Sequence, residues 1–582
     1  MGVLGFLKDK KRLALLIAAA AVIAVAAGAY LLLGGKSARD LYLSAENKNF
    51  QQYARFIQKT YADFKESRQP YLTGSYKTRT EITFGVNEAG GLASDKSVNG
   101  ILDIAGKCKL IVDSKNNPAE KANLTQLSLL LEKTPFLDAE TFSKGQQLYF
   151  TVPVFTPGRY FKVDTSRLNE VYDRFKIPIK PLRVPSLIDA ASAVELDSEK
   201  FNSLTGEYGR YISQSIQDKD VQFGKPVDID ISGQQAKGRE VSVNLDGAAF
   251  TALVNGLAAK AGRDDVFAQL TYGNFAAVSE IAGEAGIFRL FDYLDATGAL
   301  ALNDTEKELL KALNVKKDLE GFKKKLGELF KDCSFTNGMK MELILDKSGN
   351  ILDRKAVTTM KNAKSGTEYE ISIHTGTNSL KYNDYRNRYL EIEISTKSGE
   401  GSRQYFKFSP KIEPASKNEN YKGNMEISWG IDYDSGTHSS TRVGLDLNTS
   451  TDELTSKNNS TVKYTIEMEG NNEGQPEKLT GEIKTSQWKN NKLKTRNQTT
   501  AFTVNADLPD FGITGFSAEL NLAKEDKLGL EAFDLPEVAG ENVVDLNSAT
   551  DIELNKVWDD IMGSFGTFYM TNKPIVDAVL GE

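Results

Sequence analysis

The chain has 582 residues, of which 40% are hydrophobic and 26% charged, with a formal net charge of −7, 2 Cys and 2 His. This apolar content is too high for a disordered tail, a mean hydropathy of −0.38 is too low for a multi-span transporter, and two cysteines are too few for a disulfide-stapled secreted domain. The acidic balance argues against a nucleic-acid binder, and the length predicts roughly two to four domains.

An uncharged apolar segment covers residues 13–35. Its 23 residues would form a helix about 34 Å long, enough to cross a hydrocarbon core of roughly 30 Å. Four basic residues precede the segment and two follow it closely, so the positive-inside rule places residues 1–12 in the cytoplasm and the bulk of the chain outside. A cleaved secretory signal is the alternative, because small residues at 25–29 offer a cleavage site. The length of the segment favours an uncleaved, single-pass anchor.

The charge and the cysteines fit an extracytoplasmic location. The first 40 residues carry a net charge of +4, which leaves −11 on the remainder. An exterior this acidic would be repelled by an anionic membrane surface. Cys108 and Cys333 either form one disulfide or remain two buried thiols, and their separation of 225 residues leaves both readings open.

The region after the anchor predicts one helix followed by strands. An apolar stripe with spacings of 3, 4, 4 and 3 predicts an amphipathic helix that ends at Pro70 and Gly74; its members are Phe50, Tyr53, Ile57, Tyr61 and Phe64. Strand patterns follow at 80–84, 101–112, 124–131, 147–152 and 160–163, with turns at 87–91 and 113–118. Short turns between strands predict antiparallel pairing.

The middle of the chain predicts helices, and strands return after it. Helical spacing occupies 248–261, 275–294 and 304–330, the last opening with a capping box of Thr305 and Glu308. Strand patterns continue from 339 to about 527 and include a hairpin of 341–345 and 351–358 around a turn at 346–350. A final helix begins with a capping box of Thr550 and Glu553, and one apolar stripe follows it: Leu554, Val557, Trp558, Ile561, Met562 and Phe565.

These patterns predict an α+β protein with an N-terminal transmembrane helix and long, twisted, antiparallel, half-barrel-like sheets covered by helices. The expected divisions are a cytoplasmic N-terminus (1–12), the anchor (13–35), a first α+β module (36–235), a helical region (236–332), a mainly β module (333–540) and a C-terminal helix (541–582). The order helix, strand and Gly turn occurs twice, before Tyr160 and again before Tyr405. This repetition is either an internal duplication or the chance likeness of short strands.

Three segments carry a resemblance to a known architecture. They are 124–131, then Gln-Leu-Tyr-Phe-Thr-Val-Pro at 147–153, then Arg-Tyr-Phe-Lys-Val-Asp at 159–164. Their order resembles the half-barrel of bacterial envelope lipid carriers of the LolA and LppX type, and the whole chain resembles membrane-anchored surface proteins of Gram-positive bacteria. The resemblance implies a curved sheet that holds an apolar ligand and transfers no functional residue. Those carriers are free or lipid-anchored single modules. This chain is longer and has a peptide anchor, which argues against a role in shuttling a lipid between membranes.

The sequence offers little catalytic chemistry. Nucleophile–base sites of the Ser-His or Cys-His kind need a histidine, and His374 is expected on a strand face while His438 is expected in a polar loop. Ser486 and Lys489 match a Ser-x-x-Lys motif, but no Lys-Thr-Gly accompanies them and the segment has a strand pattern. No Walker loop is present.

Metal sites are not indicated either. The stretch from Asp432 to Gly436 resembles a Ca²⁺ loop, but Gly436 occupies the fifth position and Val443 the twelfth, where such loops place acids. The two cysteines lack zinc spacing.

We therefore expect a membrane-anchored extracytoplasmic protein with a non-catalytic binding role and no cofactor, metal or nucleic acid. Its partners would be the membrane, through residues 13–35, and a lipid, another apolar ligand or an envelope protein. One alternative is a structural or assembly protein of the cell surface. Another is a carboxylate-type hydrolase of envelope polymers, because acidic pairs form in space rather than in sequence.

Overall fold

The computed structural model describes residues 37–580 with gaps. The gaps are 89, 91–95, 178–196, 232, 285, 297–306, 308–310, 312–313, 315–317, 379–387, 398–401, 415–420, 434–437, 453–456, 470–476, 491, 510–512, 531–532 and 539. The expected anchor at 13–35 lies outside the described residues. Within them, no helix combines the length and the apolar character needed to cross a membrane.

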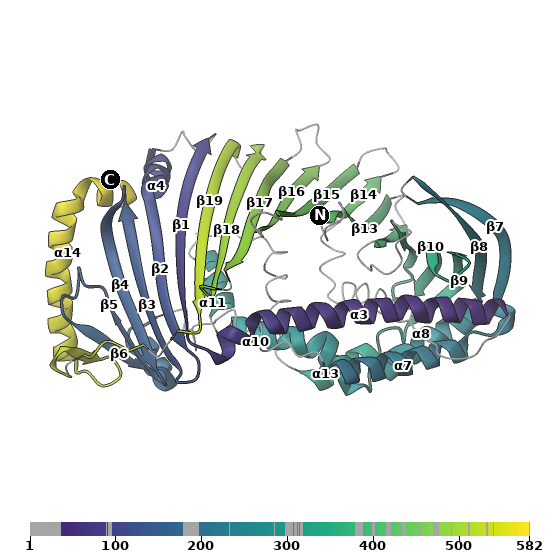
Figure 1. Ribbon diagram of the computed structural model, residues 1–582, viewed down its shortest axis with the longest axis horizontal. Helices are drawn as coiled ribbons and strands as arrows, with labels where there is room; N and C mark the ends of the chain where they lie inside the picture. The colour runs from purple at the N-terminus through teal and green to yellow at the C-terminus, as the bar shows by residue number, and fades with distance from the viewer. Residues whose placement is uncertain are drawn as a thin grey trace.

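All the described strands belong to one 20-stranded sheet (Figure 1). The strands are β1 (Tyr76–Glu88), β2 (Cys108–Asn117), β3 (Ala122–Leu131), β4 (Thr134–Lys144), β5 (Gln147–Thr151), β6 (Tyr160–Asp164), β7 (Val221–Ile231), β8 (Gln234–Leu245), β9 (Cys333–Leu345), β10 (Ile351–Asn362), β11 (Glu368–Thr377), β12 (Arg388–Lys397), β13 (Ser402–Pro414), β14 (Tyr421–Tyr433), β15 (His438–Asp452), β16 (Lys457–Glu469), β17 (Glu477–Asn490), β18 (Thr495–Leu508), β19 (Ile513–Leu528) and β20 (Val543–Asp545).

The strand order follows from the pairings. Strands β7 to β19 pair in chain order, and β19 then pairs with β1, so that β1 to β6 continue the sheet. All these pairs are antiparallel, and β20 is added in parallel at β6. The sheet therefore stays unclosed, with β7 and β20 at its two edges.

The helices gather at the two ends of the sheet and along one side of it (Figure 1). They are α3 (Ala38–Thr73), α4 (Lys96–Lys107), α5 (Leu168–Arg174), α7 (Ser198–Ser215), α8 (Gly247–Ala261), α9 (Asp265–Ala268), α10 (Asn274–Glu284), α11 (Ile287–Ala296), α13 (Leu319–Gly327) and α14 (Asp551–Leu580). Figure 1 shows α14 standing beside β4 and β5, while α7, α8 and α13 lie near β7 to β10.

Several sequence predictions are confirmed. The α+β class and the antiparallel pairing hold, and α8 matches the helix expected at 248–261. The hairpin of β9 and β10 turns at Asp346, whose Oδ1 accepts the backbone N–H groups of Ser348 and Asn350, both at 2.8 Å, while Gly349 adopts a φ of +75°. The capping box before α14 is present, because the side chains of Thr550 and Glu553 both bond across the first turn.

Other sequence predictions were wrong or incomplete. Most of the strand expected at 101–112 is helix α4, and β2 begins only at Cys108. Strand β4 was not predicted, and neither was helix α7. The helix expected at 275–294 is two helices, because Gly286 between them has a φ of +76° that a continuous helix excludes. Of the two residues expected to end the first helix, Pro70 lies inside α3, whereas Gly74 does cap α3 after Thr73. The turn expected at 113–118 was wrong, because β2 continues to Asn117 and pairs with β1 and β3 along this stretch.

Some expectations stay predictions. The capping box at Thr305 and Glu308 is outside the described residues. The division into modules and the internal duplication are not decided by the pairings. The sheet itself runs without a break across the expected boundaries at 235 and 332.

The main hydrophobic core lies where helices cover β7 to β12. The C-terminal end of β9 is fully buried there, with Leu343 at 0% and Leu345 at 1% exposure, and Phe250 of α8 packs edge-to-face on Phe335. A smaller core joins β6, α5 and the segment before α14 around Val163. The two cores sit toward opposite ends of the sheet.

Helix α3 connects distant parts of the sheet. Its 36 residues measure about 54 Å, and it runs along the strand ends from β7 toward β1 (Figure 1). Near its start, Arg39 donates to the backbone carbonyls of Ile216 (2.7 Å) and Ser213 (2.9 Å). The next turns place Glu46 in a buried ion pair with Arg354 of β10.

The far end of α3 meets β18, β19 and β1. The hydroxyl of Tyr71 donates to Asp526 at 2.6 Å, and Arg496 donates to the carbonyl of Ser67 at 2.6 Å. Burial and the bond to Asp526 raise the pKa of Tyr71. Because β10 and β19 are nine strands apart in the sheet, α3 is a brace that spans the strands between them.

The buried ion pair gives a stability prediction. Replacing Arg354 with Met leaves Glu46 buried without its cation, since the side chains of the pair are only 8% and 3% exposed. We expect a loss of about 3–5 kcal/mol in the free energy of unfolding, measured by urea denaturation of the full chain in detergent. The double variant E46M/R354M should recover most of that loss, because no charge is then stranded.

Lys361 provides the matched control on the same strand. It pairs with Glu368 at 3.1 Å, but both side chains are about half exposed. Lys361→Met should therefore cost less than about 1 kcal/mol. Equal losses from the two single substitutions would show that α3 is not secured by the buried pair.

Candidate functional site

An apolar band crosses one face of the sheet. Side chains of directly paired residues share a face, and the registers place apolar residues opposite one another from strand to strand. Across the nine strands β13 to β19, β1 and β2, we define the apolar band as Phe406, Phe408, Met425, Ile427, Trp429, Val443, Leu445, Leu447, Val462, Tyr464, Ile466, Leu479, Ile483, Phe502, Val504, Ala506, Ala518, Leu520, Leu522, Ile82, Phe84, Val86, Leu110 and Val112.

The apolar band lies on the same face as the contacts of α3. Leu522 and Ile82 are paired across β19 and β1, and two residues further along these strands come Lys524 and Thr80, then Asp526 and Thr78. Asp526 accepts the Tyr71 hydroxyl of α3, so this is the face toward which α3 is turned. The same face continues past β13 into the helix-covered core at β12, where Ile394 is buried.

The band is less covered than the core that continues it. Helices α8 and α3 pack on β7 to β10, whereas in the described part of the chain the helices approach β13 to β19 closely only where the end of α3 meets β18 and β19 beyond the band. Most band members are therefore half-buried, and Phe502 and Leu520 are 37% and 36% exposed, against 0% for Leu343 of β9. These two large apolar side chains are neighbours and both are accessible, so an apolar ligand could cover them together.

One glycine in the band allows an aromatic ring to lie flat across two strands. Tyr464 is directly opposite Gly481, and its hydroxyl reaches over β17 to donate to the carbonyl of Thr503 at 2.8 Å. A Cβ on Gly481 would lie 2.0 Å from that carbonyl and 2.3 Å from the hydroxyl. Such Gly–aromatic pairs let a sheet bend. The ring of Tyr464 thus covers the position at Gly481, where β17 has no side chain, and keeps the band continuous.

The opposite face of the sheet is polar. Cross-strand ion pairs run along it, and Thr, Asn and Ser fill the positions between them. The pairs are Arg79–Asp113, Lys109–Glu81, Lys407–Glu391, Arg403–Glu393, Arg442–Glu426 and Lys478–Glu467. The sheet is thus two-sided, with one face suited to water and one to hydrocarbon.

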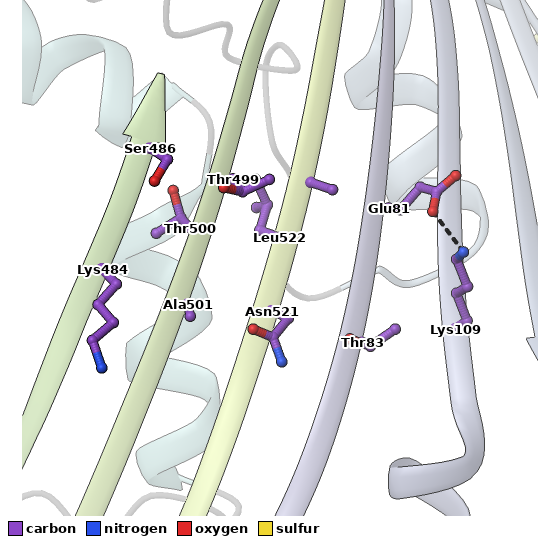
Figure 2. Close-up of a pocket in the computed structure, with 11 residues that line it drawn as sticks. Glu81, Thr83, Lys109, Lys484, Ser486, Thr499, Thr500, Ala501, Asn521 and Leu522 are labelled. Atoms are coloured by element: carbon purple, nitrogen blue, oxygen red, sulfur yellow. Dashed lines mark ion pairs between the residues drawn. The ribbon is translucent and has the colours of Figure 1, made fainter. Parts of the chain in front are cut away.

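A shallow depression of about 340 Å³ lies on the polar face. Figure 2 shows its lining across β17, β18, β19, β1 and β2, with Lys484, Thr499 and Asn521 on neighbouring strands and Glu81 paired to Lys109. Its lining mixes hydroxyl, amide and charged groups with the apolar residues Ala501, Leu522 and Ala523. The continuous apolar surface of the sheet is the apolar band on the other face.

The candidates from the sequence do not assemble into a catalytic site. Ser486 lies on β17 as the strand pattern predicted, and its hydroxyl donates to Asn459 at 2.6 Å. Lys489, three residues along the same strand, belongs to the opposite face. The Ser-x-x-Lys match therefore does not bring the lysine to the serine.

The start of the expected acidic loop and the two cysteines lie on different strands of the sheet. Asp432 lies in β14 opposite His438, which is the first residue of β15 and not part of a loop as expected. Residues 434–437 are outside the described residues. Cys108 and Cys333 are free thiols on β2 and β9, which are twelve strands apart in the sheet, so they do not form a disulfide within the chain. Within the described residues, no group of three His, Cys, Asp or Glu side chains could hold a metal ion.

His374 belongs to a polar network on the polar face. It lies on β11, as expected for a strand face, and its Nε2 is 2.8 Å from Asp353 of β10. The hydroxyl of Tyr389 donates to the same carboxylate, and Glu391 is 3.6 Å from the Nδ1 of His374. Glu391 in turn pairs with Lys407 at 2.7 Å.

The pKa shifts in this network favour charged pairs. The hydrogen bond to Asp353 raises the pKa of His374. Burial acts to raise the pKa of Asp353, but the bonds from His374 and Tyr389 outweigh it and lower the value. The bond from Lys407 lowers the pKa of Glu391. A general acid needs a raised carboxyl pKa, which neither carboxylate has.

Comparisons with known proteins add no family. Neither a protein-family model nor a curated protein sequence matches the chain. Among solved structures, Pseudomonas aeruginosa OccK2 in complex with glucuronate aligns with 78% of this chain and 98% of its own at 7% identity, with a TM-score of 0.16. Lipovitellin aligns over the same shares at 6% identity, with a TM-score of 0.07. TM-scores this low do not indicate a shared fold, so neither likeness bears on function.

The sequence analysis missed the apolar band as a unit. The signal was present in each strand as alternation, for example Val443, Leu445 and Leu447 in β15. The pairing of β19 with β1, which joins the two halves of the band, lies between residues more than 400 positions apart and leaves no local pattern.

The network around His374 gives a pH prediction. The pKa of His374 is raised on folding, so its protonated form contributes stability that is fully present below the unfolded value of about 6.5 and is lost as pH rises through the folded value. We expect the urea midpoint of the full chain in detergent to fall between about pH 6 and pH 8. His374→Gln should remove this slope, whereas His438→Gln should keep it. A slope that survives His374→Gln would contradict the assignment.

Proposed function

We propose that this protein is a single-pass membrane-anchored extracytoplasmic protein that binds the hydrocarbon chains of lipids on the apolar band. The observation that carries the proposal is the band itself. It continues a buried core across nine further strands without a closely packed helix among the described residues. The resemblance of 124–131, 147–153 and 159–164 to envelope lipid carriers agrees with such a role.

The size of the band supports a ligand larger than a single side chain. Nine strands at about 4.8 Å spacing span about 40 Å, and three alternating residues along a strand span about 13 Å. The product is roughly 500 Å², at the upper end of the apolar patches that monomeric soluble proteins expose. Apolar patches of this size often serve a binding function.

The expected anchor would keep the band close to a source of lipid. Residues 13–35 would end just before α3, whose N-cap is Ser37 and whose first helical residue is Ala38. Helix α3 is fixed to β10 and β19, so a tether at its start would hold the whole sheet beside the bilayer. Lipids would then reach the band without diffusing through water.

An assembly role is the second candidate. Helix α14 exposes Ile552, Trp558 and Met570, which are 81%, 60% and 75% exposed. Exposed apolar side chains on one helix favour a protein contact. The hydrolase alternative has less support, because the pKa shifts of Asp353, Glu391 and Glu81 are all downward.

Charges placed in the band should abolish lipid binding. Phe502 and Leu520 are direct partners across β18 and β19, so F502E/L520E puts two carboxylates where acyl chains would lie. We expect the lipid that co-purifies with the full chain in detergent to fall at least about tenfold, measured by quantitative mass spectrometry of extracted lipid.

The neighbouring pair on the polar face is the matched control. Ala501 and Asn521 are also direct partners, and A501E/N521E adds the same charge to the opposite face of the same strands. This variant should keep its lipid. The proposal fails if both double variants retain equal amounts of lipid. It also fails if the unmodified chain carries no more lipid than the F502E/L520E variant does.

A further inference from the structure

The dimensions of the apolar band match hydrocarbon chains laid along the strands. One leaflet contributes about half of a hydrocarbon core of roughly 30 Å, so an acyl chain is about 15 Å long. Three alternating residues along a strand, such as Phe502, Val504 and Ala506, span about 13 Å. The band is thus about one acyl chain wide in the strand direction and much longer across the strands.

The strand spacing matches the width of such chains. Carbon atoms pack at about 3.5–4.0 Å, so an extended hydrocarbon chain fills about one strand interval of about 4.8 Å. Side chains on one face of a pleated sheet form rows between which a chain can lie. Nine strands therefore offer room for more than two chains side by side.

The two borders that the band reaches along the strand direction differ in polarity. The comparison uses the five neighbouring strands β17, β18, β19, β1 and β2. Beyond one side, the same face first carries polar residues in register, namely Thr485, Gln487, Gln498, Arg496, Lys524, Asp526, Thr80, Thr78 and Ser114, before Tyr76 and Leu528 follow. Beyond the other side lie Leu508 and Phe516. An amphipathic molecule fits this face in one direction, with its polar end at the polar border.

The polar border carries two cations and one carboxylate, since Lys524 pairs with the buried Asp526 at 3.0 Å and Arg496 lies opposite Asp526 in register. Arg496 and Lys524 both lie over the ring of Tyr71, at 5.4 Å and 5.8 Å from its centroid. Residues 47–69 of α3, the helix that ends at this border, carry five basic and two acidic side chains, whereas the chain beyond residue 40 is acidic overall. The local cationic excess complements a phosphate group.

We propose that the apolar band holds several phospholipids at once, with their acyl chains side by side and parallel to the strands and their phosphate groups at the border marked by Arg496 and Lys524. This inference rests on the proposed lipid binding and deepens it. The band is then a surface that binds several lipids, and the binding position of each lipid adjoins that of the next. A pocket for one lipid would need an enclosed wall around it, which an open row of strands does not supply.

The test is the number of lipids per protein. Native mass spectrometry of the full chain in detergent, titrated with phosphatidylglycerol carrying 16-carbon chains, should show two or more lipids beyond those that remain on the F502E/L520E/V462E/I466E variant. The lipids that remain on that variant belong to the expected anchor. Palmitic acid in place of the phospholipid should bind more weakly, since it has one chain and no phosphate.

A charge in the middle of the band separates the possibilities. Val462 and Ile466 lie on β16 within the band, so V462E/I466E should lower the number of bound lipids without removing all of them. T461E/T465E changes the polar face of the same strand and should leave the number unchanged. One bound lipid, lost completely in V462E/I466E, would overturn the multi-lipid arrangement and leave the proposed function standing. No lipid above the anchor background would overturn both.

The position of the phosphate is tested separately. Lys524→Gln should reduce the preference for phosphatidylglycerol over phosphatidylcholine by about fivefold, because one cation near an anionic headgroup is removed. Lys484→Gln, which removes an exposed cation from the polar face, should leave the preference unchanged. An unchanged preference in Lys524→Gln would overturn the placement of the headgroups at this border.

Discussion

The architecture depends on one constraint, the register of the antiparallel pairing. In each strand of the apolar band, apolar residues alternate with polar ones, and every register brings these residues to the same face as those of the neighbouring strand. A slip of one residue in any pair would turn one strand over and place its apolar side chains among the ion pairs of the polar face. The continuity of both faces across twenty strands therefore rests on every pairing being correct.

An unclosed sheet of this length also needs support across the strands. Helix α3 provides it through contacts of different kinds at its two ends: a buried ion pair between Glu46 and Arg354, and the hydrogen bond from Tyr71 to Asp526. Helices α7, α8 and α13 contribute to the buried core at β7 to β10, which continues the apolar face beyond the band. Burial is thus greatest at the helix-covered end, whereas the strands that α3 spans keep a half-buried apolar face.

Local features of the fold were predictable where the chemistry is local. The turn at Asp346 and the cap at Thr550 depend on side chains that bond to backbone a few residues away, and both were predicted correctly. The strand expected at 101–112 failed because Ile101, Leu102 and Ala105 are spaced for a helix as well as for a buried strand. The split at Gly286 depends on one backbone torsion that the apolar pattern does not reveal.

The sequence by itself determined the apolar segment at 13–35, the acidic charge of the chain beyond residue 40 and the alternation that makes each strand two-sided, because these are properties of composition and of short periods. Only the tertiary structure decided that β19 pairs with β1, since hydrogen bonds between distant strands leave no local trace. That single pairing joins two sets of strands into one apolar band. The tertiary structure also decided which part of the apolar face helices cover, because coverage depends on where α3 and α8 are held.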